Sequence, residues 1–104
     1  MSRWEAMLRG VAERENVMAK ISGLNTTVAH AGWSAADWRR PVEVALESFG
    51  PARLMCGSDW PVALLNGDYT RVWDSTRQAV QNVAPGCVQA LLGSNARRIY
   101  HLEW

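Results

Sequence analysis

Two short apolar runs, separated by a helix-length segment, constrain the fold of this chain most. Residues 17–22 (VMAKIS) and 53–57 (RLMCG) have the composition of buried strands. Strands joined through a helix pair in parallel by a right-handed crossover. A sheet of only two strands exposes open edges and an apolar face that further strands must cover. We therefore expect an α/β fold that oligomerisation completes.

Helix signals flank the first run. Ser2 and Glu5 have the spacing of a capping box. Apolar side chains then recur at helical spacing: Trp4, Leu8 and Val11. These signals predict an amphipathic helix over residues 2–14.

Caps and breakers predict the later helices. The predicted helices cover residues 41–48, 68–83 and 85–93, and a short last helix follows them. Pro41, Asp68 and Pro85 mark starts, Gly93 marks an end, and Ser94 caps the last helix. The expected inner faces are Val42, Ala45, Leu46 and Phe49, and then Val72, Thr76, Ala79, Val80 and Val83.

Length and charge limit the functional classes. The 104 residues make a single domain, residues 1–104, in which eleven Lys and Arg balance ten Asp and Glu with the signs interspersed. Nucleic-acid-binding surfaces are typically more basic. No apolar stretch approaches the roughly 20 residues of a membrane span, and Arg3, Glu5 and Arg9 stand where a signal peptide needs an apolar core. We expect a cytoplasmic protein that binds neither nucleic acid nor membrane.

Cysteine and tryptophan indicate how the chain is covered. Cys56 and Cys87 form no disulfide framework and are expected as small buried or half-buried apolar residues. Six tryptophans in so short a chain carry a large apolar area that must be buried somewhere. Trp4, Trp38 and Trp73 fit helical faces, in a core or an interface. This surplus is typical of a chain that needs a partner surface.

The second apolar run ends abruptly in Gly57-Ser58-Asp59-Trp60-Pro61. Glycine, serine and proline are ordinary turn residues, and an aspartate there commonly caps a turn or the next helix. A turn does not require a tryptophan beside an acid. Asp59 is therefore either a turn cap or a functional carboxylate.

The first run contains one charge. Side-chain alternation along a strand places Lys20 and Ser22 on one face and Ala19 and Ile21 on the other. A lysine held inside a protein needs an acid or water beside it. Lys20 is thus a candidate for contact with a substrate oxygen, or for an internal ion pair.

Several motifs in order resemble the C-terminal quarter to third of the amidohydrolase-related lactonases. The motifs are Asn16-Val17, Lys20-Ile21-Ser22-Gly23-Leu24, Phe49-Gly50-Pro51, Arg53-Leu54-Met55, Gly57-Ser58-Asp59-Trp60-Pro61-Val62 and Gly93-Ser94-Asn95-Ala96-Arg97, with Tyr100 and Leu102. This branch of the amidohydrolase superfamily includes L-fuconolactonase-like and 2-pyrone-4,6-dicarboxylate lactonase-like hydrolases. The resemblance covers almost the whole chain.

The resemblance implies a partial (β/α)8 barrel, with residues 17–22 as its seventh strand and 53–58 as its eighth. Asp59 would lie just past the C-terminal end of a strand, where catalytic groups of this fold collect. In such relatives the matching aspartate takes a proton from the attacking water, and in metal-dependent members it also ligates a divalent ion, zinc in some of them. Ser58 and Trp60 would border the substrate, and Lys20 would face the barrel interior.

The chain departs from the family pattern in its histidines. Complete relatives carry a His-x-His pair on the first strand and further histidines on the fifth and sixth, segments that have no counterpart in this sequence. A catalytic zinc site needs three protein ligands. His30 and His101 are isolated and are expected in surface or loop-packing roles. We expect no cofactor in the isolated chain, with Asp59 as a metal ligand only if the site is completed.

Three interpretations of function remain open. In the first, the chain is an inactive hydrolase fragment that self-associates, with an interface above roughly 2,000 Å². In the second, it is a subunit that gives lactone or amide hydrolysis with a complementary chain, and it binds a small-molecule substrate only in that complex. In the third, several copies of Asp59 converge on a new ion site. Our expectation is the first, a homodimer or higher oligomer.

Overall fold

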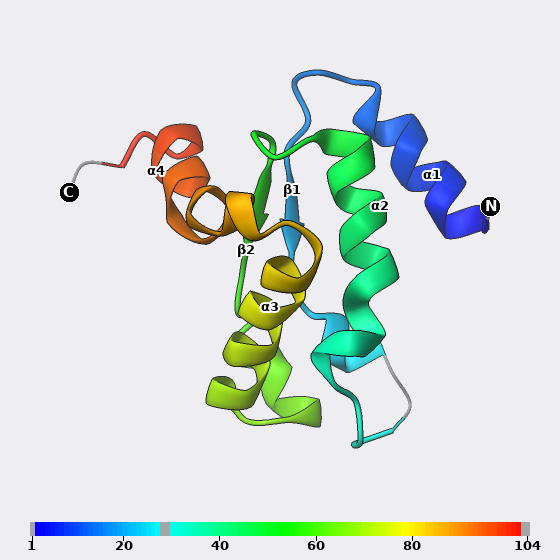
Figure 1. Cartoon of the computed structure of the whole chain (residues 1–104), viewed down its shortest axis with the longest axis vertical. Helices are drawn as coiled ribbons and strands as arrows, with labels where there is room; N and C mark the ends of the chain where they lie inside the picture. Colours follow the sequence, from blue (N-terminus) through cyan, green and yellow to red (C-terminus); the bar gives the residue numbers. More distant parts are fainter. Residues whose placement is uncertain (1, 28–29, 103–104) are drawn as a thin grey trace.

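The computed structural model describes residues 2–27 and 30–102, and it contains two short parallel strands (Figure 1). Strand β1 (Ala19–Ile21) pairs with β2 (Leu54–Cys56), in register at Ala19 opposite Leu54 and Ile21 opposite Cys56. Both strands lie within the predicted runs but are only three residues long. The α/β class and the parallel pairing predicted from the sequence are confirmed.

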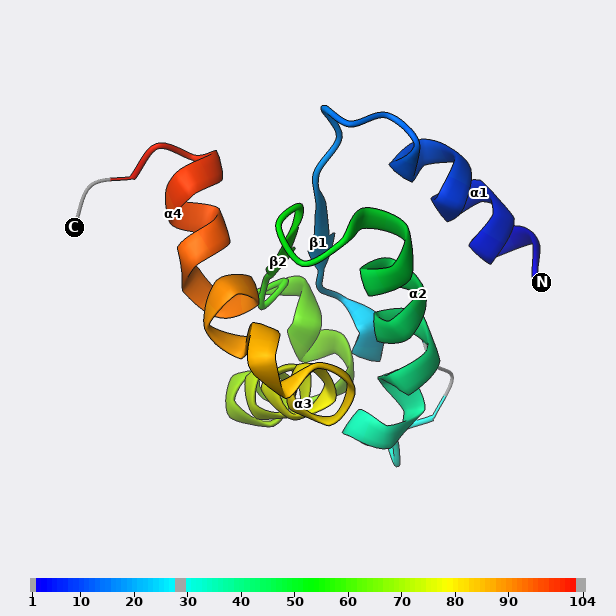
Figure 2. The same cartoon turned by 45° about the horizontal axis from the view of Figure 1, so that its top comes forward.

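Four helices form an arc around the strand pair in the described part of the chain. They are α1 (Arg3–Ala12), α2 (Arg39–Phe49), α3 (Tyr69–Val83) and α4 (Asn95–Ile99). Figure 2 shows them following one another in an arc, with α1 at one end, α4 at the other and the strands inside it. Short 3-10 turns cover Leu24–Thr27, Ala35–Trp38, Val62–Asn66 and Pro85–Cys87. No helix in the described ranges is long and apolar enough to cross a membrane.

Helix α3 begins where its cap predicts, whereas α2 begins earlier than the predicted start at Pro41. The Asp68 side chain caps α3 by accepting a hydrogen bond from the Arg71 amide at 2.7 Å. The buried residues of α3 are Val72, Thr76, Ala79 and Val80, whereas Val83 is half-buried. Helix α2 buries Val42, Val44, Ala45 and Phe49, and Leu46 is only half-buried. Helix α2 begins two residues before Pro41, because a proline in the first turn lacks only an amide that has no partner there.

Helix α1 is less buried than its apolar pattern predicts. Trp4 and Val11 are 49% and 50% exposed, and among the apolar face residues only Leu8 is half-buried. The helix packs on α2 and is tied to it by ion pairs of Arg9 with Glu47 (2.7 Å) and of Arg40 with Glu5 (3.1 Å). The predicted apolar face of α1 is therefore partly open to solvent.

The end of the chain corrects the predicted break at Gly93. A π-helical stretch, Ala90–Ser94, runs through Gly93 directly into α4. Ser94 has helical dihedral angles and makes no capping hydrogen bond. The buried Asn95 side chain instead donates hydrogen bonds to the Pro51 and Leu54 carbonyls, so tertiary contacts hold the continuous helix against β2.

The two edges of the sheet differ. The Ala19 amide donates to the Arg53 carbonyl, and the Gly57 amide donates to the Ile21 carbonyl, both at 3.0 Å. Because backbone groups alternate along a strand, the Leu54 carbonyl points to the outer edge of β2. The Asn95 side chain donates a hydrogen bond to this carbonyl at 2.8 Å. Strand β1 pairs with β2 alone within the described ranges, so its outer edge is open.

Tryptophans divide between core and surface. Trp33 and Trp38 are each 2% exposed, and their rings stack with centroids 4.9 Å apart. The Arg71 guanidinium covers Trp33 at 3.8 Å from the ring centroid. Trp60, in contrast, is 63% exposed. Cys56 and Cys87 are half-buried and free, as predicted.

Candidate functional site

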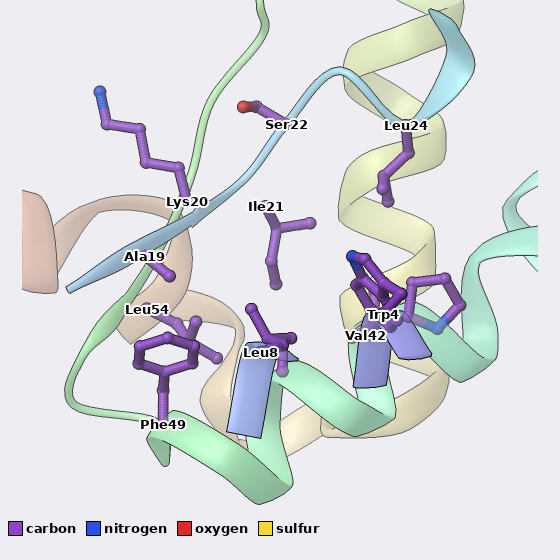
Figure 3. A pocket seen from close by; sticks show the side chains of 12 residues that line it. Trp4, Leu8, Ala19, Lys20, Ile21, Ser22, Leu24, Val42, Phe49 and Leu54 are labelled. Carbon is purple, nitrogen blue, oxygen red and sulfur yellow. The ribbon is translucent and has the colours of Figure 1, made fainter. Parts of the chain in front are cut away.

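One face of β1 carries its polar side chains. Figure 3 shows Lys20 and Ser22 pointing away from α1 and α2, whereas Ala19 and Ile21 point toward them. Ile21 is buried and Lys20 exposed, in agreement with the predicted alternation. On the neighbouring strand, a Cβ added at Gly57 would lie 3.3 Å from the Ser22 Cβ and 3.8 Å from the Lys20 Cδ. Because Gly57 has no side chain, this face of the sheet is not covered at that position.

Asp59 lies just beyond the carboxyl end of β2. It is half-buried and has a left-handed backbone, with φ of 56°, which aspartate adopts more readily than most residues. Its carbonyl accepts a hydrogen bond from the Ala63 amide at 2.7 Å. Its carboxylate lies against Gly23, in the loop that follows β1. The two loops at the carboxyl ends of the strands therefore meet at Asp59.

A buried asparagine joins these two loops. Asn25 is fully buried, and its Nδ2 donates to the carbonyls of Ala63 (2.8 Å) and Asn66 (3.2 Å). The Asn66 side chain reciprocates by donating to the Asn25 carbonyl at 2.8 Å. No local sequence signal identifies Asn25, because its partners Ala63 and Asn66 lie 38 and 41 positions further along the chain and only the pairing of the two strands brings them close.

Ser58 and Trp60 flank Asp59 in the same loop. The Ser58 hydroxyl accepts a hydrogen bond from the Trp60 amide at 3.3 Å, which fixes the turn locally. The Trp60 ring is mostly exposed. The structure thus brings Ser58, Asp59 and Trp60 together, and their roles toward a substrate stay predictions.

Lys20 has an aromatic neighbour rather than an acidic one. Its ammonium lies 5.3 Å from the centroid of the Tyr100 ring, within cation–π range. No ion pair joins Lys20 to a carboxylate among residues 2–27 and 30–102. The internal ion pair considered from the sequence is therefore not formed within the described chain, and contact with a substrate oxygen stays a prediction.

The donor set for a metal is incomplete in this chain. Within the part that the structure describes, no three His, Cys, Asp or Glu side chains gather as a metal site would require. His30 and His101 are both exposed. Asp59 supplies one carboxylate, and a zinc ion needs about three protein ligands. The residues present therefore do not fit a zinc site by themselves.

A cavity of about 240 Å³ lies between α1, α2 and β1 (Figure 3). Its walls are mainly apolar: Trp4, Leu8, Val42, Ala45, Phe49 and Leu54, with β1 (Ala19–Ile21) and the following Ser22. The Lys20 and Ser22 side chains point away from the apolar side chains that line the cavity. The cavity offers apolar surface rather than catalytic groups, and β1 forms part of its wall.

Comparison with known proteins decides the lineage. The model of a family described as amidohydrolase matches residues 1–102. The chain belongs to the amidohydrolase family. The resemblance inferred from the spaced motifs is confirmed.

Curated relatives of the chain extend well beyond the matched segment. The chain is 38% identical over 115 residues to L-fucono-1,5-lactonase of Burkholderia multivorans, covering 98% of this chain and 36% of the relative. It is 29% identical over 99 residues to the uncharacterized protein y4mH of Sinorhizobium fredii, covering 95% of this chain and 33% of that protein. The chain therefore spans about a third of the length of these relatives.

Solved amidohydrolase structures superpose closely on the chain. A crystal structure of a Burkholderia multivorans amidohydrolase with bound zinc aligns with a TM-score of 0.86 and 36% identity, over 97% of this chain and 37% of that one. A second crystal structure, with bound HEPES, gives a TM-score of 0.85 and 39% identity with the same coverage. The short strands and their helices thus have the arrangement of one segment of an amidohydrolase.

Proposed function

We propose that this chain is the C-terminal part of a (β/α)8-barrel hydrolase that opens lactones, with Asp59 as the group that takes the proton from the attacking water. The observation that carries the proposal is the place of Asp59. Its carboxylate lies where the loops after two adjacent parallel strands meet. In a complete (β/α)8 barrel this position would fall at the end where catalytic groups collect. The substrate class is inferred from the relative named as a fucono-lactonase.

The open face of the strands supports a site shared with other strands. Lys20 and Ser22 point away from α1 and α2, and Gly57 places no side chain beside them. A small substrate could approach Asp59 across this face, with Lys20 near one of its oxygen atoms. A divalent metal would supply Lewis-acid chemistry only in a completed site, because the described residues of this chain do not hold one by themselves. Asp59 would be one of its ligands, and the others would come from outside this chain.

For the isolated chain we propose self-association without appreciable turnover. Large apolar side chains stay exposed over the loop after β2, with Leu65 at 81% and Trp60 at 63%, and over α1, with Met7 at 62%. Strand β1, which pairs only with β2 within the described ranges, also lines the apolar cavity. Burying these surfaces favours a homo-oligomer over a monomer.

The hydrolase proposal is tested in a hybrid enzyme. This chain replaces the matching segment of the Burkholderia multivorans lactonase, and hydrolysis of L-fucono-1,5-lactone is measured with and without zinc. We expect turnover by the hybrid and none by the isolated chain. Asp59→Asn in the hybrid should lower kcat by about 10²- to 10⁴-fold, the usual contribution of a general base.

A matched variant controls for loss of an acidic residue. Asp74 lies on the exposed side of α3, so Asp74→Asn should leave kcat of the hybrid unchanged. Full activity of the Asp59→Asn hybrid would refute the catalytic role. Lactone turnover by the isolated chain would instead favour an assembled site, including the alternative in which several Asp59 carboxylates converge on an ion.

A further inference from the structure

We propose that Gly23 is a positioning residue for Asp59: the absence of a side chain at Gly23 leaves the space that the Asp59 carboxylate occupies. The catalytic meaning of this inference rests on the proposed function, but the geometric relation between the two residues does not. Gly23 is the second residue after β1, and Asp59 is the third residue after β2. The two positions are thus brought together by the parallel strand pair.

Any residue with a Cβ at position 23 would come too close to the Asp59 carboxylate. A Cβ added at Gly23 would lie 2.8 Å from Asp59 Oδ2 and 3.3 Å from its Cγ, whereas ordinary contacts begin at 3.4 Å. An alanine at this position would therefore displace Oδ2 by about 0.6 Å, the difference between 3.4 and 2.8 Å, unless the backbone shifts instead. Displacements of that order are enough to degrade a catalytic arrangement.

The backbone on both sides limits the freedom to yield. The Asp59 carbonyl is held by the Ala63 amide, and the Ala63 carbonyl is held by the buried Asn25 side chain. On the other side, the Gly23 carbonyl accepts hydrogen bonds from the Thr26 amide and hydroxyl, at 3.2 and 2.8 Å. Because both loops are fixed, the Asp59 side chain is the part that must move.

Gly50 provides a comparison site that has a positive φ but no close contact. Gly23 has φ of 68° and Gly50 has φ of 76°, so an alanine is strained at either position. A Cβ added at Gly50, however, meets no atom within 4 Å. With ψ of 164°, Gly50 lies in a backbone region that is nearly exclusive to glycine, so Gly50→Ala reports the strain of its own backbone without any contact with the Asp59 carboxylate.

The test is a double-mutant cycle in the full chain. Gly23→Ala and Gly50→Ala are each made with Asp59 present and with Asp59→Ala, and the urea midpoint of each of these four proteins is compared with its parent. We expect Gly23→Ala to lower the midpoint much less when Asp59 is already alanine, because the contact is gone. The loss caused by Gly50→Ala should be the same in both backgrounds.

A spectroscopic readout reports on position rather than stability. The ¹³C resonance of the Asp59 carboxyl carbon should shift in Gly23→Ala and stay unchanged in Gly50→Ala. Equal losses of midpoint for Gly23→Ala in both backgrounds, with an unshifted resonance, would overturn the proposal. If Gly23→Ala fails to fold, recovery of folding by Asp59→Ala supports it, whereas failure of both proteins assigns Gly23 to folding and overturns it.

The hybrid lactonase separates this inference from the proposed function. There Gly23→Ala should lower kcat more than it raises KM, and Gly50→Ala should change neither. Coupling and a resonance shift without any turnover by the unsubstituted hybrid would reject the lactonase proposal and leave the positioning intact. Turnover that depends on Asp59 but not on Gly23 would do the opposite.

Discussion

At the scale of single residues, Cys56 ties stability to pH. Burial raises the pKa of its thiol from 9.0 to about 11. The folded state therefore keeps a proton that the unfolded chain releases above pH 9, and the resulting stabilisation is complete below pH 9 and lost as pH rises to about 11. We expect the unfolding free energy of the native chain to fall by roughly 2 kcal/mol more than that of Cys56→Ala over this range.

Urea unfolding of both proteins at pH 8, 9, 10 and 11 provides the measurement. Other groups titrate in this range in both proteins, so only the difference between the two curves is informative. Parallel curves would show that the thiol is solvated in the native state.

The residues of the candidate site differ in how far the sequence predicts them. Asp59 was found through its motif, whereas Gly23 and Asn25 are identified only by contacts between two loops.

At the scale of elements, Asn95 holds the last helix to β2. Its side chain is 3% exposed and donates to the Leu54 carbonyl at 2.8 Å. Asn95→Ala leaves buried carbonyls without a partner, so we expect a loss of about 1 to 3 kcal/mol in unfolding free energy. Asn82→Ala, which removes an exposed hydrogen bond with Gln78, should cost far less. Similar losses in urea unfolding would contradict the role of Asn95.

The elements also show what local sequence determines. Helix α3 was predicted closely because its signals are local: Asp68 caps it, and its apolar residues repeat at helical spacing. The break predicted at Gly93 was wrong because a glycine weakens a helix by only about 1 kcal/mol, less than the long-range hydrogen bonds of Asn95 can supply. Strand positions were predicted from apolar runs, but their length depends on neighbouring strands that the run itself does not specify.

At the scale of the whole molecule, the exposed apolar surface predicts association. Trp4 and Val11 lie on the apolar face predicted for the first helix, but the chain's own helices leave both of them exposed. We expect light scattering after size exclusion, at micromolar concentration, to give a mass at least twice 11.6 kDa. Dilution should shift the elution only slowly, since an interface above roughly 2,000 Å² is typical of permanent complexes. A folded monomer would refute the association proposal.

The unequal edges of the sheet bear on how such an assembly ends. Asn95 already takes the outward carbonyl of Leu54, whereas nothing described pairs with the far side of β1. Two copies that meet β1 to β1 about a two-fold axis use up the same surface on both, and no equivalent edge is left for a third. Growth of this kind is self-limiting, so a concentrated solution should hold pairs of chains and not fibres.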